Sequence, residues 1–129
     1  MKTEELEDRI RRTTRFNAAL IENNAAPTFS AFLAACAEQA GAKRAELIRA
    51  LNVDRNYGYQ LLNGTRLPTR AQVVRIALFL RLDVKCAQKL LNLAGREALY
   101  VRRPEDARVV YCLEHDIAFE KACAFVWGE

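Results

Sequence analysis

The sequence is poor in the two residues that most often interrupt helices, with five glycines and three prolines among 129 residues. Most of them fall between stretches of helical periodicity rather than inside them. Alternation of polar and apolar residues is too short in every segment to predict a β-strand. The scarcity of helix breakers therefore predicts an all-α protein.

Long apolar runs are also missing. No run approaches the ~20 residues that a membrane-spanning helix needs, and the charged N-terminus lacks the apolar segment typical of a signal peptide. We therefore expect a cytoplasmic protein with no membrane partner. The four cysteines do not stand in metal-binding spacings, so they are predicted to be small reduced core residues: Cys36, Cys86, Cys112 and Cys123.

Features typical of enzymes are absent as well. His115 is the only histidine, and no titratable neighbour in the sequence would make a base–nucleophile pair with it. We find no phosphate-binding loop, no paired carboxylates in a pocket context and no metal spacing. We expect no enzymatic activity, no cofactor and no small-molecule ligand.

The chain does have an uneven distribution of charge. Residues 1–40 carry five basic and six acidic side chains, and residues 76–129 carry eight of each. The whole excess behind the net charge of +4 lies in residues 41–75, with seven basic and two acidic side chains. Such a basic surface is typical of proteins that bind nucleic acid, and a merely solvated face is the alternative.

Helical periodicity divides the chain into three parts. Residues 1–27 are predicted to form an N-terminal arm of short helices, and residues 28–95 a compact unit of five helices. Residues 96–129 are predicted to form a helical hairpin, with helices from Pro104 to Leu113 and from Ile117 to Trp127. The hairpin is balanced in charge, and its apolar stripe is either a dimer contact or intramolecular core: Phe119, Phe125, Val126 and Trp127.

Caps and apolar stripes mark the five helices of the central unit. Thr69 and Gln72 have the spacing of a capping box, and Asp83 is placed to cap the last helix. The expected helices run from Thr28 or Ser30 to Ala40, from Ala45 to Leu51, from Asp54 to Asn63, from Thr69 through Leu80, and from Asp83 to Gly95.

Residues 43–63 are predicted to form a helix-turn-helix. Asn52 occupies the turn, where the backbone must enter the left-handed region that asparagine tolerates. Asp54 follows as the N-cap of the second helix. Apolar residues supply the inner faces of the two helices: Leu47, Ile48, Leu51, Val53 and Leu61.

The segment KRAELIRALNVDRNYGYQLLNGTRLPTR, residues 43–70, resembles the lambda-repressor-like (Cro, XRE) class of helix-turn-helix proteins. The resemblance extends from about Thr28 to Ala94, and its most specific feature is the Asn-Gly-Thr-Arg-x-Pro segment. The Arg-Asn-Tyr-Gly-Tyr-Gln run, Leu99-Tyr100 and the terminal hairpin are similar to a subgroup of bacterial regulators. The resemblance implies a five-helix DNA-binding domain and a bacterial origin.

Four positions differ from the usual pattern of that class, which has alanine at Ile48, glycine at Asn52, a branched apolar residue at Gly58 and glutamate at Leu62. Glycine inside a helix costs ~1 kcal/mol relative to alanine, so Gly58 needs an explanation. Either Ile48 fills the space that Gly58 vacates, or glycine lets the second helix bend.

The outer face of the second helix is the surface that would read base edges in a major groove. The predicted base-reading residues are Arg55, Asn56, Tyr59 and Gln60, with Tyr57 and Asn63 at the flanks. Exposed polar residues without a partner are the alternative, although two exposed tyrosines favour contact.

Cations at helix N-termini predict anion binding, because the positive end of the helix dipole disfavours a cation there. The predicted phosphate contacts are Lys43, Arg44, Thr65, Arg66 and Arg70. If the five basic residues Lys43, Arg44, Arg55, Arg66 and Arg70 each neutralised one phosphate, the log–log salt slope of binding would be about −4.5 per protomer at most.

We therefore expect a transcription regulator that binds double-stranded DNA, as a homodimer because one such helix reads only a short half-site. The alternative is a protein-interaction module that keeps the helix-turn-helix scaffold and uses Tyr57, Gly58 and Tyr59 as its interface. The salt dependence of binding distinguishes the two functions, since DNA binding weakens steeply with salt and a tyrosine-centred protein contact does not.

Overall fold

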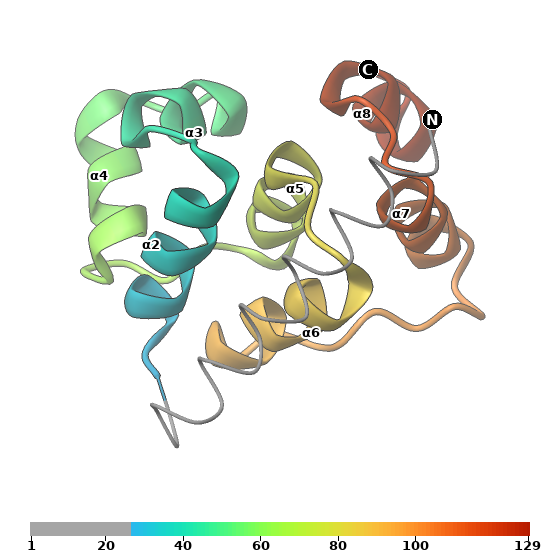
Figure 1. The fold of residues 1–129 in the computed structure, drawn as a ribbon, viewed down its shortest axis with the longest axis horizontal. Coiled ribbons are helices and arrows are strands. Elements are labelled where there is room, and N and C mark those ends of the chain that lie inside the picture. Colours follow the sequence, from blue (N-terminus) through green and yellow to red (C-terminus); the bar gives the residue numbers. More distant parts are fainter. Residues whose placement is uncertain (1–26) are drawn as a thin grey trace.

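The computed structural model describes residues 27–129, and in this range every regular element is an α-helix (Figure 1). The all-α prediction is confirmed for this part of the chain. The predicted N-terminal arm lies almost entirely outside the described residues. The helices are α2 (Phe29–Ala40), α3 (Arg44–Leu51), α4 (Arg55–Asn63), α5 (Arg70–Leu80), α6 (Val84–Leu93), α7 (Pro104–Glu114) and α8 (Phe119–Trp127).

The helix boundaries follow from the predicted caps. Thr28 caps α2 by accepting a hydrogen bond from the backbone N–H of Ala31, and α2 ends at Gly41 in the left-handed conformation. The capping box of Thr69 and Gln72 is confirmed at the start of α5. Because these signals are local, every helix predicted within residues 28–129 is found, with ends within a few residues of the predicted ones.

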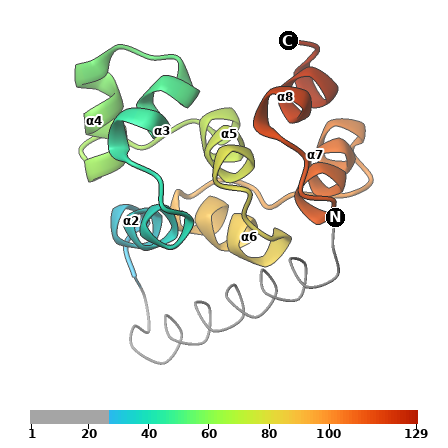
Figure 2. The same cartoon turned by 45° about the horizontal axis from the view of Figure 1, so that its top comes forward.

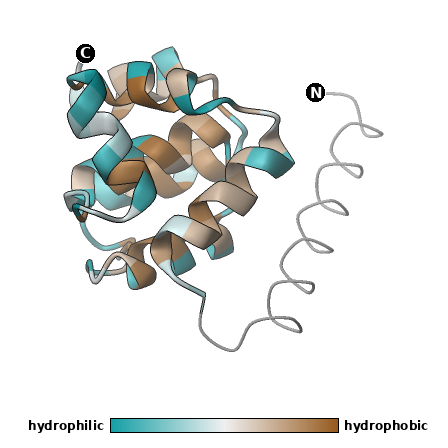
Figure 3. Ribbon diagram, turned by 90° about the vertical axis from the view of Figure 1, so that its left-hand side faces the viewer, coloured by the Kyte–Doolittle hydropathy of each residue, from teal (hydrophilic) through white to brown (hydrophobic). Residues whose placement is uncertain are grey.

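Helix α5 is the centre of the fold. It packs against α2, α3, α6, α7 and α8, with α3 and α4 on one side and α7 and α8 on the other (Figures 1 and 2). Figure 3 shows hydrophobic ribbon gathered in the middle of the bundle and hydrophilic segments toward its edge. The described residues form one core, whose most deeply buried large side chains include Phe32, Leu61, Val73, Leu90 and Val109. The helical hairpin is therefore built on the same core as the five-helix unit.

The apolar stripe predicted on the hairpin divides between core and surface. Val126 is buried, and Phe119 and Trp127 pack partly buried against the core. Phe125 is half exposed, with its ring centroid 5.7 Å from that of Tyr111, which is exposed as well. Most of the stripe is thus intramolecular core, and a dimer contact through Phe125 stays a prediction.

The four cysteines are free and buried, as the sequence predicted. Burial raises the pKa of Cys36 to about 12, with a smaller contribution from Asp83, so this thiol stays protonated at neutral pH. Within residues 27–129, no group of acidic, histidine and cysteine side chains is arranged to hold a metal ion. In the same range no helix has the length and apolar character needed to cross a membrane.

Candidate nucleic-acid interface

The predicted turn between α3 and α4 is confirmed. Asn52 ends α3 in the left-handed region, at φ 56° and ψ 47°. Its backbone N–H donates to the carbonyl oxygens of Ile48 and Arg49, both at 3.1 Å. The hydrogen bonds satisfy carbonyls left free at the helix end, and the left-handed residue redirects the chain into α4.

Asp54 caps α4 as predicted. Its carboxylate accepts hydrogen bonds from the backbone N–H groups of Asn56 at 3.1 Å and Tyr57 at 3.5 Å. The first helical residue is therefore Arg55, whose side chain is exposed at the N-terminal end of α4.

The contact between Gly58 and Ile48 explains the unusual glycine. A Cβ atom at position 58 would lie 2.6 Å from Cγ2 and 2.8 Å from Cγ1 of Ile48, closer than side-chain atoms approach one another. Both residues are buried, and α4 continues through Gly58 to Asn63. The structure therefore supports the first of the two accounts, in which the larger residue on α3 fills the space that glycine leaves on α4.

The outer face of α4 carries the predicted base-reading residues. Arg55, Asn56 and Asn63 are exposed, and Tyr59 and Gln60 are partly buried. Positions 56, 59, 60 and 63 follow the helical repeat of one face, opposite the buried face of Gly58, Leu61 and Leu62. The structure thus brings these side chains together on one polar surface.

The two tyrosines of α4 are less exposed than the sequence suggested, because both pack against the core. The guanidinium of Arg55 lies over the ring of Tyr59 at 5.7 Å, and that of Arg66 lies over Tyr57 at 5.9 Å. The Tyr57 hydroxyl is 3.5 Å from the side-chain nitrogen of Gln72 on α5. The expectation of two exposed tyrosines is therefore wrong, and the rings instead position two arginines at the surface.

The predicted contacts Asn63 and Thr65 bind one another. The Asn63 side-chain oxygen accepts from the backbone N–H of Thr65 at 2.9 Å and from its hydroxyl at 2.6 Å. Gly64 between them takes a positive φ of 88°. These hydrogen bonds build the turn that ends α4, so the Thr65 hydroxyl already donates its proton within the loop.

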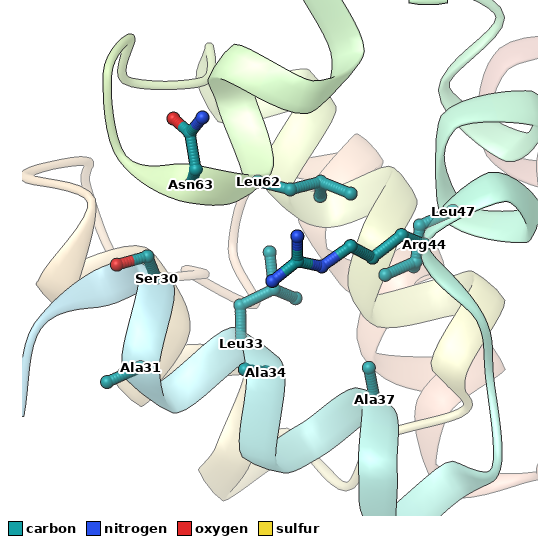
Figure 4. A pocket seen from close by; sticks show the side chains of 9 residues that line it. All are labelled: Ser30, Ala31, Leu33, Ala34, Ala37, Arg44, Leu47, Leu62 and Asn63. Atoms are coloured by element: carbon teal, nitrogen blue, oxygen red, sulfur yellow. The ribbon is translucent and has the colours of Figure 1, made fainter.

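Two of the predicted phosphate contacts stand at the N-terminus of α3. The backbone N–H of Lys43 donates to the carboxylate of Glu46 at 2.9 Å, so an acid of the first turn partly offsets the nearby cations. Arg44 lies across a groove of about 270 Å³ between α2, α3 and the end of α4 (Figure 4). Its guanidinium reaches over the apolar lining formed in part by Leu33 and Leu62.

Arg70 has a different place from the one predicted. Its guanidinium binds the carboxylate of Asp106 through two hydrogen bonds, at 2.8 and 3.1 Å, and also donates to the carbonyl oxygens of Glu97 and Ala98. Asp106 is only 2% exposed. An anion does compensate the cation at this helix N-terminus, but it is a carboxylate of the chain itself. We therefore withdraw Arg70 from the predicted phosphate contacts.

Asp106 is a structural residue that the sequence did not reveal. Burial acts to raise the pKa of its carboxyl, yet the hydrogen bonds from Arg70 and from the backbone N–H of Tyr100 hold the pKa below its ordinary value. In the sequence Asp106 resembles an ordinary acid in the first turn after Pro104, and its partner is 36 residues away. The position gave no signal of an ion pair.

Arg75 is a second cation of the basic stretch that faces the interior. Its Nε donates to the carbonyl oxygen of Ala50 at 2.7 Å, and its guanidinium binds Glu129 at 2.8 Å. It also lies over the rings of Phe119 and Trp127, so it joins α3 to α8. Two of the seven basic residues in residues 41–75 are thus paired with acidic residues of the C-terminal part.

Comparison with known families agrees with the helix-turn-helix arrangement of α3 and α4. Residues 28–86, less than half of the chain, match a family model described as a helix-turn-helix domain. This match supports a helix-turn-helix family of DNA-binding proteins for this segment. No curated protein and no solved structure matches the chain.

Proposed function

We propose that this protein is a transcription regulator that binds double-stranded DNA with α4 in the major groove. The observation that carries the proposal is the outer face of α4, where an N-capped helix presents Arg55 and Asn56 to solvent. Exposed cations lie before this helix at Lys43 and after it at Arg66. A polar reading surface between cations is the arrangement that base contacts and phosphate contacts need.

Each side chain has a chemistry that fits a base or a phosphate. The guanidinium of Arg55 matches the two acceptors of guanine, and the amides of Asn56 and Gln60 match adenine. Lys43, Arg44 and Arg66 would neutralise phosphates on either side of the groove. These four cations, counting Arg55, would contribute about −3.6 at most to the salt slope, less than the sequence predicted because Arg70 is engaged elsewhere.

The alternative, a protein-interaction surface centred on the tyrosines, has less support. Tyr57 and Tyr59 are partly buried, and each has an arginine over its ring. An aromatic anchor of a protein interface needs an open ring that enters a pocket of the partner. The positive charge of these arginines is better suited to binding a polyanion such as DNA.

We further propose that the regulator is a cytoplasmic bacterial protein of the lambda-repressor-like type, with no enzymatic activity. It would act as a homodimer, since α4 alone spans only a short half-site. Within the hairpin, Tyr111 and Phe125 offer the exposed aromatic surface for such a contact.

The proposal is tested by fluorescence anisotropy with the full chain and a pool of random duplex DNA at low salt. Wild type is expected to bind, and the double variant Arg44→Ala/Arg55→Ala to bind much more weakly. A matched control removes two exposed charges elsewhere, Arg102→Ala/Lys121→Ala, and should bind as wild type does. Absence of binding by wild type, or equal binding by the first double variant, rejects the proposal.

Sequence specificity is tested by selection from the same pool. A homodimer predicts a palindromic site whose half-sites are about one helical turn apart. In the selected site, Arg55→Ala should relax the preference at one base pair and leave the others unchanged. If the selection enriched no common sequence, the protein would bind only the sugar-phosphate backbone of the DNA and would not read bases.

A further inference from the structure

The segment after α6 lies against the loop that joins α4 to α5. The Nε of Arg96 donates to the carbonyl oxygen of Pro68 at 3.0 Å. Next along the chain, the carbonyl oxygens of Glu97 and Ala98 accept from the guanidinium of Arg70 at the start of α5. These three hydrogen bonds fix residues 96–98 beside the loop, so Arg96 is held there although it lies outside the helix-turn-helix motif.

Arg96 brings an unbalanced charge to this loop. Its acidic neighbour Glu97 forms an ion pair with Arg103, at 2.9 Å between side-chain nitrogen and oxygen. Arg96 itself is exposed and makes no ion pair with any residue in the part of the chain that the structure describes. Among residues 27–129, the positive charge of Arg96 is therefore exposed and has no carboxylate in ion-pair contact.

The guanidinium of Arg96 also has donors to spare. Only its Nε is used, and the two terminal nitrogens have no hydrogen-bond partner among residues 27–129. Terminal guanidinium nitrogens bind phosphate oxygens in a two-pronged geometry. A side chain anchored at Nε and open at its tip has lost part of its conformational freedom before binding, which lowers the entropy cost of contact.

Arg66 stands in the same loop, two residues before Pro68. Its guanidinium lies over Tyr57 of α4, and its backbone N–H donates to the carbonyl oxygen of Gln60. Arg66 thus belongs to the start of this loop, and Arg96, from the segment after α6, is hydrogen-bonded to Pro68 at the other end. An exposed cation within this loop, which follows α4, and a second one hydrogen-bonded to its far end are suited to contact phosphates of a DNA strand.

We infer that Arg96 is a DNA-phosphate contact, which extends the interface beyond the helix-turn-helix motif into the segment after α6. This inference rests on the proposed function of α4. The even charge of residues 76–129 concealed the contact, because acids of that part neutralise Arg70 and Arg75 instead of Arg96.

The test measures the salt dependence of DNA affinity for the full chain and three variants at position 96. Arg96→Ala and Arg96→Gln should each reduce the magnitude of the log–log slope by about 0.9, the value for one phosphate. Arg96→Lys keeps the charge and should keep the slope. Arg102→Ala is the matched control, since Arg102 is an exposed arginine just before α7, and it should leave the slope unchanged.

The outcomes separate this inference from the proposed function. If wild type binds with a steep slope and Arg96→Gln has the same slope, Arg96 only holds the loop and the inference is overturned. A lower affinity with an unchanged slope would have the same meaning. If wild type does not bind duplex DNA at low salt, the proposed function fails and the inference fails with it. Urea unfolding of each variant verifies that the fold is intact.

Discussion

Two groups of arginines in one basic stretch of the sequence have opposite surroundings. Arg55 at the start of α4 and Arg66 just after this helix lie at the surface, each over a tyrosine ring. Arg70 and Arg75 belong to α5 and bind carboxylates from the C-terminal part of the chain. The difference shows that the charge counted along a segment is not the charge that its surface presents.

The position of α5 is the physical reason for the difference. Helix α5 is surrounded by other helices, so a long cation on it must reach a carboxylate or stay poorly solvated. Asp106 and Glu129 supply those carboxylates from α7 and from the end of the chain. Helix α4 has one open face, where a cation remains hydrated and available to a partner.

Removing Asp106 breaks the ion pair of Arg70, one of the two arginines of α5 that bind carboxylates, and has the largest expected effect. Asp106→Ala leaves the guanidinium of Arg70 without its partner in a largely buried site, which costs about 3 kcal/mol of unfolding free energy. Urea unfolding measures the loss. Glu97→Ala is the control, because its ion pair with Arg103 is exposed and its removal should leave the urea midpoint unchanged. Equal midpoints for Asp106→Ala and wild type would contradict the structural role.

The same ion pair predicts a pH dependence with a definite sign. Because the pKa of Asp106 is lower in the folded state, its contribution to stability is present above the ordinary aspartate value of 3.8 and is lost as the pH falls below it. Asp106→Asn cannot titrate. The difference in unfolding free energy between wild type and Asp106→Asn should therefore shrink as the pH falls from 7 to below 3.8. A constant difference across that range would exclude a lowered pKa.

A substitution at Gly58 tests the crossing of α3 and α4 that supports the exposed arginines. Gly58→Ala should destabilise the protein by about 1 to 2 kcal/mol, because the clash with Ile48 exceeds the gain in helix propensity. In an Ile48→Ala background the same change should be neutral or stabilising. Thermal unfolding of the four proteins of this double-mutant cycle gives the coupling. Additive effects would mean that the two residues are not matched.

The smallest expected effect concerns the N-cap of α4, next to the exposed arginine Arg55. Asp54→Ala removes the N-cap of α4 and should cost ~1 kcal/mol of stability, whereas Asp54→Asn keeps the cap. Asp54→Asn also removes a negative charge beside Arg55, so it should bind DNA more tightly than wild type at low salt. Unfolding and anisotropy on the two variants separate the two roles. Weaker binding by Asp54→Asn would indicate that the acid itself contacts the partner.

Much of the fold could be predicted because its signals are local. The turn at Asn52, the cap at Asp54 and the capping box of Thr69 and Gln72 each depend on neighbours within a few residues. The coupling of Gly58 with Ile48 was one of two accounts, and the contact between α3 and α4 decides for it.

The rest of the candidate site depends on contacts between distant segments. The sequence pattern predicts a phosphate contact at Arg70, because no neighbouring residue in the sequence indicates its ion pair with Asp106 on α7. It placed Tyr57 and Tyr59 at the surface, because their packing depends on how α4 lies against the core. It omitted Arg96, whose position depends on a hydrogen bond to Pro68 across 28 residues.

The central claim is that the exposed cations that form no ion pair within residues 27–129 carry the interaction with DNA. The most direct test is the salt dependence of duplex binding for wild type and for single alanine variants at Lys43, Arg55 and Arg66, measured by anisotropy. The account predicts a steep negative slope for wild type that loses about 0.9 in magnitude with each substitution. Lys121→Ala should not change the slope. Binding that is insensitive to salt, or slopes that the three substitutions leave unchanged, would contradict the account.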